Sequence, residues 1–589
     1  MDSNAGALEP DTNHLGLLYD IKFKNAIIMI THIKLPIGLS DFKEVREENY
    51  YYVDKSLFIQ EILNRSSKVI LLPRPRRFGK TLNMSMLRYF LEKREESLVH
   101  LFKGLAIEQK TSIMQHQGQY PVIFLTFKSC KGGTLKKCLS EIRRLLKKLY
   151  LEHKASVYPK LNANEQKDYD IIIEKQGNID DLEEALSFLM QLLNQQTGKR
   201  VIVLLDEYDV PIHAGQEHGY YEDIVLFMKL LLGNALKDNS DLEKGIVTGV
   251  LRIAKESIFS DLNNLDVLSL LRSEFDRYFG FTEEEIEQLS KDFSLAESIA
   301  VLKKWYNGYL FGNRVIYNPW SIISFLMSED RFPRPYWINT ASESLLRDLI
   351  TRTDPDFQEQ IETLLSGFTI TTELNENIVL RDLEYNEQNI WSLLVFSGYL
   401  KPVKMIPQPM IPLYELAIPN LEVYSFYQNT LKSWLHHQIG GKRLQMLLSA
   451  LIKMDFETFG ELLKEMVLVI LSYHDTAGNE PEKVYHAFVL GLLTHLMDRY
   501  VIRSNRESGY GRYDVLMIPH QKAEPGFIFE FKKVNRPKEK NEVEAMKSAL
   551  DQIKDKQYAT ELRDLGIENI WGIGVVVEKK QVWVQSLKC

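Results

Sequence analysis

The chain has 589 residues, of which 45% are hydrophobic and 26% are charged, and its formal net charge is −8. This composition excludes a disordered or low-complexity chain and predicts several packed domains, roughly three or four at the usual domain size. No segment approaches the ~20 consecutive apolar residues of a membrane-spanning helix, so we expect no membrane partner.

The three cysteines are Cys130, Cys138 and Cys589, and none belongs to a Cys-x-x-Cys pair. Their spacing argues against a zinc knuckle or a disulfide framework and favours a reducing, cytoplasmic setting. The modest negative charge does not decide whether nucleic acid is a partner, because a local basic groove can coexist with an acidic total. We interpret residues 1–30 as a poorly ordered leader, since the apolar run Ala26–Ile30 is short and no cleavage site follows it.

A phosphate-binding pattern follows the leader. Gly79-Lys80-Thr81 comes after the apolar run Val69–Leu72, a predicted buried strand, and before Leu82–Lys93, a predicted helix. This order aims backbone N–H groups and a positive helix end at a phosphate. Lys80 would reach the β- and γ-phosphates and the Thr81 hydroxyl would contact Mg²⁺. Arg74 stands where the standard loop has its first glycine.

Strands and helices then alternate from Ile33 to about Ser260, which predicts a parallel sheet with helices on both faces. The further strands are expected at Pro121–Phe127, Val201–Asp206 and Lys244–Val250, and the helices at Leu135–Glu152 and Ile179–Gln195. In the first of these helices Leu139, Ile142, Leu145, Leu146 and Leu149 recur at helical spacing. We therefore expect its basic residues, Arg143, Arg144, Lys147 and Lys148, to form a solvated face without a function.

A second motif supports nucleotide binding. Val201–Leu205 is a continuous apolar run that ends in Asp206 and Glu207. Such a run suits a strand that is buried on both faces. Asp206 would hold Mg²⁺ and Glu207 would polarise the attacking water; the alternative is a core strand that ends in solvated acids. Together with the loop at Gly79, the motif favours nucleotide binding at the carboxyl ends of the strands.

The middle of the chain carries weaker signals. Residues 281–345 are predicted to be mainly helical and include the aromatic cluster Trp305–Tyr309. That cluster is either a platform for a nucleotide base or, in the favoured interpretation, the core of a small lid domain. Residues 346–471 are expected to form a connector, first mixed and then helical from Ser425 to Leu471.

The last segment, residues 472–589, is predicted to be a second α/β domain. Its strands are expected at Tyr510–Ile518, Gly526–Val534 and Ile570–Val577, with a helix at Asn541–Asp555. Alternation places Glu530 and Lys532 on one face of their strand, and an antiparallel neighbour would bring Asp514 alongside. Two adjacent carboxylates call for a divalent cation, and Mg²⁺ or Mn²⁺ suits oxygen ligands. The alternative is a hairpin with ordinary exposed charges.

These residues resemble the PD-(D/E)xK nuclease superfamily. Asp514, Glu530 and Lys532 match its carboxylates and lysine, and Glu482, before the helix Tyr485–Leu493, matches its first-helix glutamate. Gln552 matches a glutamine that often follows the core strands. The resemblance implies Asp514, Glu530, Lys532 and Gln552 as catalytic residues. It also implies Glu482, Asp514 and Glu530 as ligands of Mg²⁺ or Mn²⁺, and nucleic acid as the partner.

The N-terminal part resembles the AAA-ATPase-like family, which is commonly fused to this nuclease module. The matching motifs are Leu35–Gly38, Tyr52–Lys55, Arg74–Thr81, Leu205–Asp209, Thr248–Arg252 and Trp305–Tyr309. The missing first glycine is expected in this family. The resemblance implies ATP as the ligand, bound by Arg77, Phe78, Gly79, Lys80 and Thr81, with Thr81 and Asp206 on Mg²⁺ and Glu207 as catalytic base. Arg252 would sense the γ-phosphate, or else pack as an ordinary arginine.

The predicted fold class is therefore α/β: a P-loop NTPase parallel sheet in residues 31–280, then the helical lid and connector, then the nuclease-like domain. The leading function is an ATP-binding and ATP-hydrolysing protein whose metal-dependent nuclease-like domain acts on nucleic acid. The alternative is a nucleotide-driven switch or assembly protein of a conflict or defence system, in which the nuclease fold only binds. The choice between DNA and RNA and the oligomeric state stay open.

Overall fold

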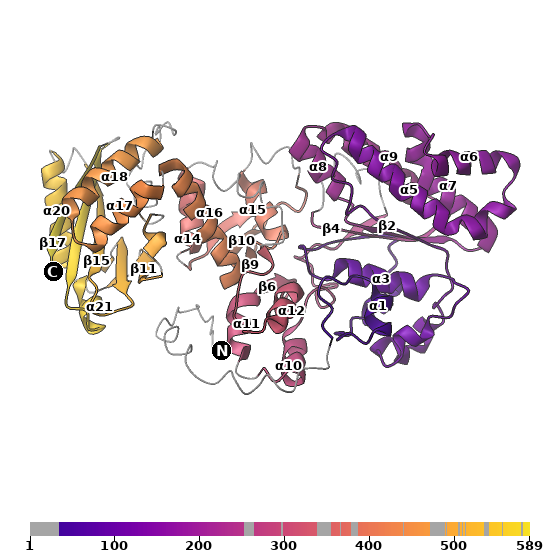
Figure 1. Ribbon diagram of the computed structural model, residues 1–589, viewed down its shortest axis with the longest axis horizontal. Helices are drawn as coiled ribbons and strands as arrows, with labels where there is room; N and C mark the ends of the chain where they lie inside the picture. The colour runs from indigo at the N-terminus through magenta and orange to yellow at the C-terminus, as the bar shows by residue number, and fades with distance from the viewer. Residues whose placement is uncertain are drawn as a thin grey trace. The chain divides into compact units, whose positions relative to one another are not determined.

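The fold is that of a computed structural model of the whole chain (Figure 1). The structure describes residues 34–251, 264–295, 298–338, 355–365, 367–378, 387–439, 441–471, 489, 492–496, 498–504, 507–508, 511–512, 514–534, 541–556, 558–578 and 581–589. The contacts divide the chain into two compact units. The N-terminal unit contains Phe23–Leu345 and Thr371–Val423, and the C-terminal unit contains Leu346–Ile370 and Tyr424–Cys589.

A five-stranded parallel sheet forms the centre of the N-terminal unit, with the strand order β2-β3-β4-β1-β5. The strands are β1 (Val69–Pro73), β2 (Val122–Thr126), β3 (Val201–Asp206), β4 (Leu242–Gly249) and β5 (Leu265–Val267). Every residue of β1 and β3 is buried, because their continuous apolar runs lie between helices on both faces. The predicted parallel sheet is confirmed.

Helices cover both faces of this sheet (Figure 1). One face carries α1 (Phe42–Glu47) and α3 (Lys80–Leu91), and the other carries α5 (Leu135–Val157), α6 (Ala163–Glu174), α7 (Ile179–Thr197), α8 (Val210–His218) and α9 (Tyr221–Leu236). Local signals set the helix ends. Asn178 and Asp181 form a capping box at the start of α7, and Gly198 ends this helix in the left-handed conformation.

The basic helix α5 corrects one expectation. Of the predicted core face, Leu139, Ile142, Leu146 and Leu149 are buried and Leu145 is half-buried. Of the basic residues, Arg144 and Lys148 are exposed and Lys147 is half-exposed. Arg143, however, is only half-exposed, and its Nη2 donates to the carbonyl of Gly177 at 3.2 Å. The prediction that Arg143 lies on a solvated face is therefore wrong, because its long side chain reaches the loop before α7.

The lid region combines helices with a short hairpin. It contains α10 (Glu283–Asp292), α11 (Ile299–Tyr306), β6 (Tyr309–Phe311), β7 (Arg314–Ile316) and α12 (Pro319–Met327). Tyr306 and Tyr317 pack in its hydrophobic core with Leu302 and Phe325, as the lid-core interpretation predicts. The hairpin β6–β7 was not predicted.

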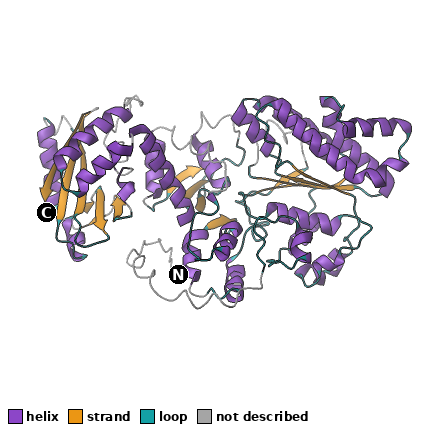
Figure 2. Cartoon of the chain, viewed as in Figure 1, coloured by secondary structure: helices purple, strands orange, loops and turns teal. Residues whose placement is uncertain are grey.

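Helices and a small sheet follow the lid (Figure 2). The helices are α14 (Pro355–Leu365), α15 (Glu387–Phe396), α16 (Leu421–Ile439), α17 (Gly441–Ile452) and α18 (Phe456–Leu471). The sheet has the order β8-β10-β9 and consists of β8 (Ile370–Glu373), β9 (Lys401–Ile406) and β10 (Leu413–Ala417).

The C-terminal unit is built on a mixed sheet with the order β11-β14-β15-β16-β17. The strands are β11 (Tyr500–Ser504), β14 (Val515–Pro519), β15 (Gly526–Lys533), β16 (Ile570–Glu578) and β17 (Gln581–Lys588). Strands β15 and β16 are parallel, and the other neighbours are antiparallel. The α/β fold class of both parts is thus confirmed, and so is the antiparallel pairing of β14 with β15.

Alternation along β15 separates its two faces. Phe527, Phe529 and Phe531 pack in the core that α17 and α18 complete. Ile528 belongs to a different core, which includes Ile553 of α20 (Glu542–Asp555) and Leu562 of α21 (Ala559–Asp564). By the two-residue period, Glu530 and Lys532 lie on the face that α20 covers.

Of the helices that the structure describes, none combines the length and the apolar character required to cross a bilayer.

Candidate functional site

The loop between β1 and α3 lies between a buried strand and a helix, the order predicted for a phosphate-binding loop, and we use that name for it below. Gly79 caps α3 with φ 84°, and Arg77 has φ 67°, so two residues of the loop adopt left-handed conformations. Lys80 begins the helix and is 6% exposed. Its Nζ donates to the carbonyls of Arg74 and Pro75, each at 2.9 Å. Burial lowers the pKa of Lys80, while Glu207, Asp206 and Asp209 oppose the shift. The positive end of α3 and this ammonium both face the loop.

Arg74, in the place of the missing glycine, anchors the loop. Its Nη1 donates to the carbonyls of Pro73 at 2.8 Å and Leu268 at 2.7 Å. The guanidinium lies between two rings, 5.2 Å from the centroid of Phe279 and 5.4 Å from that of Phe311. Burial lowers the pKa of Arg74, and the ring contacts and the charge of Asp276 favour the cation. A buried arginine therefore ties the start of the loop to the segment after β5.

Asp206 connects the loop with two other elements. Its side chain is fully buried, and its Oδ2 accepts from Thr81 Oγ1 at 2.8 Å. Its Oδ1 accepts from Thr248 Oγ1 at 2.6 Å, because β4 lies between β1 and β3 and ends in Thr248 and Gly249. Thr81 and Asp206 thus present adjacent oxygen atoms beside Lys80. This donor set fits Mg²⁺, which prefers hard oxygen ligands.

Glu207 lies directly after β3 with φ 53°, a left-handed conformation that is uncommon for a glutamate. Its pKa is raised by burial and by Asp206, whereas Lys80 and Lys128 lower it. Glu207 lines the cavity beside the loop. A carboxylate with a raised pKa at such a place is suited to accept a proton from water.

Asp209 is a functional candidate that sequence reasoning missed, although it ends the quoted motif Leu205–Asp209. It is 1% exposed and accepts from the backbone N–H groups of Val250 at 2.7 Å and Leu251 at 3.1 Å. These bonds and His213, at 3.5 Å, hold the pKa of Asp209 below its usual value despite burial. A Cβ on Gly249 would come within 2.8 Å of Asp209 Oδ1. Arg252, the predicted sensor, lies outside the described residues.

A cavity of about 300 Å³ lies over the phosphate-binding loop. Lys80, Thr81, Glu207, Lys128 and Lys131 contribute charged and polar groups to its lining. Its apolar lining comes from two other parts of the same unit: Leu35, Ile37, Leu39, Val53, Phe281, Pro319, Trp320 and Ile323. The cavity therefore combines a charged, polar lining with an apolar one, a combination that small-molecule sites share.

The predicted loop residues Arg77 and Phe78 both line this cavity and also contact the lid region. The Arg77 guanidinium lies 4.0 Å from the ring centroid of Trp320 in α12. Phe78 packs edge-on against Tyr309, with the ring centroids 4.9 Å apart. The carbonyl of the neighbouring Arg76 accepts from Trp337 Nε1 at 3.0 Å. The lid therefore contacts the loop through aromatic side chains.

The C-terminal sheet brings three predicted residues together. Glu530 is 1% exposed, and its Oε1 lies 3.2 Å from Lys532 Nζ, as expected for one face of β15. Asp514 immediately precedes β14, and its Oδ2 accepts from the N–H of Phe531, between those two residues, at 2.7 Å. The pairing of Val515 with Phe529 explains this contact, because the next register position places Asp514 opposite Glu530.

Gln552 bonds a tyrosine whose pKa the same carboxylates raise. Its Nε2 donates to the hydroxyl of Tyr558 at 3.2 Å. The pKa of Tyr558 is raised by burial and, to a smaller extent, by the charges of Glu530 and Asp514. Tyr558 is fully buried in the core that includes Ile528 and Leu562, so it links that core to Gln552.

The comparisons with known proteins agree with this geometry. Residues 36–259 match the family model described as a predicted AAA-ATPase, and residues 480–587 match the model of the PD-(D/E)XK nuclease superfamily. The chain joins an AAA-ATPase-like domain to a PD-(D/E)XK nuclease superfamily domain. A similar protein is described as "Uncharacterized protein in vnfD 5'region" of Azotobacter chroococcum mcd 1. It is 27% identical over 548 residues, which cover 92% of this chain and 96% of the relative.

Asp514 and Glu530, the described carboxylates expected to bind a metal ion, both lie in the region that matches the PD-(D/E)XK model. Glu482, the third predicted ligand, lies outside the described residues. Within the part of the chain that the structure describes, no group of three or more histidine, cysteine, aspartate and glutamate side chains has the spacing of a metal site. The carboxylate pair fits an oxygen-seeking divalent ion in its donor chemistry, and Lys532 balances part of the charge.

Proposed function

We propose that this protein binds ATP with Mg²⁺ in its AAA-ATPase-like domain and hydrolyses it, and that its PD-(D/E)XK domain cleaves nucleic acid. The observation that carries the ATP proposal is the convergence of Thr81 and Thr248 on Asp206, beside the buried Lys80. Two strands of the sheet, β3 and β4, supply Asp206 and Thr248 from their carboxyl ends, and the start of α3, which follows β1, supplies Lys80 and Thr81. This arrangement suits a triphosphate and its metal ion.

In the proposed reaction each residue has a separate task. Lys80 and the N–H groups at the start of α3 bind the β- and γ-phosphates. Thr81 and Asp206 would hold Mg²⁺, which would neutralise charge on the phosphate oxygens. Glu207 orients the attacking water and accepts its proton, and burial favours this role because it raises the pKa of the carboxyl group. Asp209 holds the backbone of Val250 and Leu251 in place.

The nuclease proposal assigns roles to the residues of the second site. Asp514 and Glu530 would hold Mg²⁺ or Mn²⁺, which supplies a Lewis acid at the phosphodiester. Lys532 orients the attacking water and stabilises developing negative charge. Gln552, which donates one N–H to the buried hydroxyl of Tyr558, contributes its remaining N–H donor to the nucleic-acid backbone.

Calorimetric titration with ATP and Mg²⁺ tests the first proposal. Wild-type protein should bind ATP, and Lys80→Ala should abolish binding, since the ammonium contributes charge-assisted contacts of roughly 1.5–3 kcal/mol or more. Glu207→Gln should still bind but should hydrolyse ATP on the order of 10²-fold more slowly. Equal ATP affinity in wild type and Lys80→Ala would overturn the assignment of the loop.

Incubation of the protein with DNA and with RNA tests the second proposal, in Mg²⁺ or Mn²⁺ and with or without ATP. Asp514→Ala should weaken metal binding and abolish cleavage, whereas Lys532→Ala should keep the metal and lose cleavage. Binding of nucleic acid without cleavage by the wild type would instead favour the switch or assembly protein.

A further inference from the structure

A segment that connects the sheet with the lid is fastened to the phosphate-binding loop. We call this segment, Arg277–Thr282, the strap. The N–H of Gly280 donates to the carbonyl of Phe78 at 3.1 Å. Asn83, one turn into α3, donates from Nδ2 to the carbonyl of Tyr278 at 2.9 Å. The strap therefore contacts both the loop and the helix that would bind phosphate.

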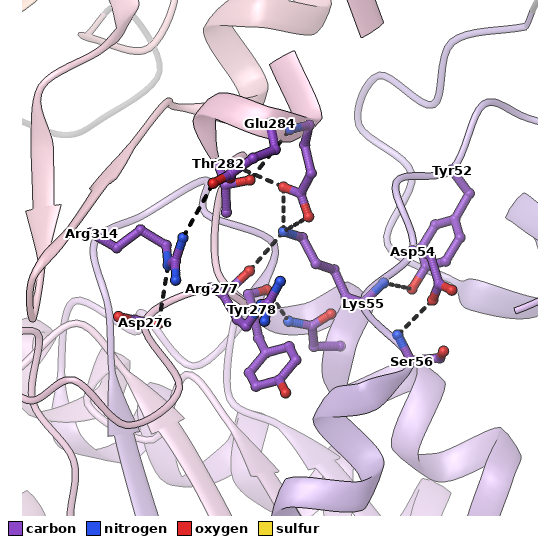
Figure 3. A network of polar contacts seen from close by, with 12 residues as sticks. Tyr52, Asp54, Lys55, Ser56, Asp276, Arg277, Tyr278, Thr282, Glu284 and Arg314 are labelled. Atoms are coloured by element: carbon purple, nitrogen blue, oxygen red, sulfur yellow. Dashed lines mark hydrogen bonds and ion pairs between the residues drawn. The ribbon is translucent and has the colours of Figure 1, made fainter. Parts of the chain in front are cut away.

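Lys55 fastens the beginning of the strap (Figure 3). This lysine lies just before α2 (Leu57–Asn64) and is 7% exposed. Its Nζ donates to the carbonyl of Arg277 at 2.7 Å and to both carboxylate oxygens of Glu285, each at 2.6 Å. Burial lowers the pKa of Lys55, and Glu285 opposes the shift. A buried ammonium with three acceptors is held in one position, because leaving any of them unpaired is costly.

Glu285 extends this network into the lid. Thr282 is the N-cap of α10, and the two residues form a capping box in which Glu285 Oε2 accepts from the N–H of Thr282 at 2.8 Å. The carboxylate of Glu285 therefore connects Lys55 and the N–H of Thr282, at the end of the strap, to the first turn of α10. In Figure 3 the Lys55 side chain extends across the gap between the segment at Tyr52–Ser56 and the strap.

The close approach of strap and loop depends on Gly280. It has φ 87°, and a Cβ there would lie 2.2 Å from Ile316 Cγ2 and 3.0 Å from the Phe78 ring. Only glycine accommodates both this conformation and this packing. The strap is therefore built to lie directly on the loop.

We propose that Lys55 and Asn83 are positioning residues for nucleotide binding: by holding the strap they keep Phe78, Gly79 and Lys80 in the geometry that binds phosphate. This inference rests on the proposed ATP site. Lys55 and Asn83 bond consecutive carbonyls of the strap, those of Arg277 and Tyr278, which lie 222 and 195 residues later in the chain. Release of either bond lets the strap and the carbonyl of Phe78 shift, and the N–H groups that follow in the loop shift with them.

Titration of the full-length chain with ATP and Mg²⁺ tests this role. Lys55→Met and Asn83→Ala should each raise the dissociation constant by about tenfold or more, the scale on which small misplacements act. Glu285→Gln should act in the same direction but less strongly, since an amide retains the capping box and removes only the charge. Lys303→Met is the matched control. This substitution removes an exposed ion pair with α10, between Lys303 Nζ and Glu283 Oε1 at 3.3 Å. It should leave the dissociation constant unchanged.

The titration also separates positioning from general stability. A variant that merely unfolds in part would bind with the wild-type dissociation constant at a reduced stoichiometry. The inference predicts the opposite, a raised dissociation constant at unchanged stoichiometry. Wild-type dissociation constants in both Lys55→Met and Asn83→Ala would overturn the inference, as would an equal loss in Lys303→Met. Failure of the wild type to bind ATP would instead overturn the proposed function.

Discussion

Glu207 has a pKa that several neighbours set in opposite directions. Burial and Asp206 raise it, and Lys80 and Lys128 lower it. If Glu207 accepts the proton of the attacking water, hydrolysis requires the ionised carboxylate, and kcat falls as the pH drops through this pKa. The acidic limb of the pH–rate profile therefore reports the charge environment of Glu207.

Lys128→Met should move this acidic limb to higher pH. The substitution removes a positive charge that favours the carboxylate, so the pKa of Glu207 rises and the ionised fraction at a given pH falls. Steady-state kcat for ATP hydrolysis, measured from pH 5 to pH 9, provides the check. Lys136→Met, which alters an exposed lysine in the first turn of α5, is the control. An acidic limb that stays in place, or moves to lower pH, would exclude Lys128 from the environment of the base.

Glu422 provides a residue-scale prediction about stability. Its side chain is buried in the first turn of α16 and accepts from the N–H of Trp337 at 2.6 Å and from Ser321 Oγ at 2.8 Å. Burial raises its pKa to about 8, although these hydrogen bonds oppose the shift. The folded state thus holds the proton more tightly than the unfolded state, in which an ordinary glutamate has a pKa of about 4.3.

Stability should therefore decline as the pH rises from the unfolded pKa towards about 8, because the folded state binds more protons throughout that window, and then level off. Glu422→Gln mimics the protonated acid and should remove this part of the decline. Thermal unfolding of both proteins at pH 6 and pH 8.5 is the measurement. The variant should gain in Tm relative to wild type at the higher pH, and an equal difference at both values would contradict the assignment.

At the scale of elements, the sequence predicts the strands that are buried on both faces. The apolar runs at Val69 and Val201 are buried on both faces, so composition alone marks them as central strands. The hairpin β6–β7 has strands of three residues, too short for any period to show. Local sequence patterns also do not give the order of the strands in the sheet, because the position of β4 between β1 and β3 depends on long-range packing.

Helix α5 leads to a prediction about an element. Arg143 contacts the loop before α7, whereas Arg144 and Lys148 are exposed on the same helix. Arg143→Ala should cost roughly 0.5–1.5 kcal/mol through the lost bond to Gly177. The Arg144→Ala, Lys148→Ala double variant should change stability by less than about 0.5 kcal/mol and leave nucleic-acid affinity unaltered. Thermal unfolding and a fluorescence-anisotropy titration with DNA and RNA test both statements. A large loss of affinity in the double variant would make α5 a binding surface.

At the scale of the whole molecule, the sequence predicts contacts between distant residues only where those residues lie at the carboxyl ends of strands in the same parallel sheet. Thr81 and Asp206 are 125 residues apart, yet both follow central strands, so parallel-sheet geometry predicts their meeting. Lys55 and Glu285 are 230 residues apart, and neither lies at a strand end. Their pairing depends on how the lid folds back onto the sheet, and one sequence carries no local signal for it.

The division into two compact units predicts how the whole chain unfolds. The cavity proposed to bind ATP lies in the N-terminal unit, and the carboxylates Asp514 and Glu530 lie in the C-terminal unit. Chains with separate cores commonly unfold in more than one step. A ligand stabilises the part that binds it, by about 2.7 kcal/mol at a free concentration 100 times the dissociation constant. Scanning calorimetry should therefore show two transitions, of which ATP with Mg²⁺ raises one.

Substitutions assign the two transitions. In Lys80→Ala the shift with ATP should disappear, because the variant no longer binds the nucleotide. In Asp514→Ala the same shift should persist, while any shift produced by Mn²⁺ on the other transition should be reduced. A single transition that ATP raises as a whole would contradict this prediction. It would show that the two units unfold as one cooperative body, and nucleotide binding at Lys80 would then be energetically linked to the carboxylates at Asp514 and Glu530.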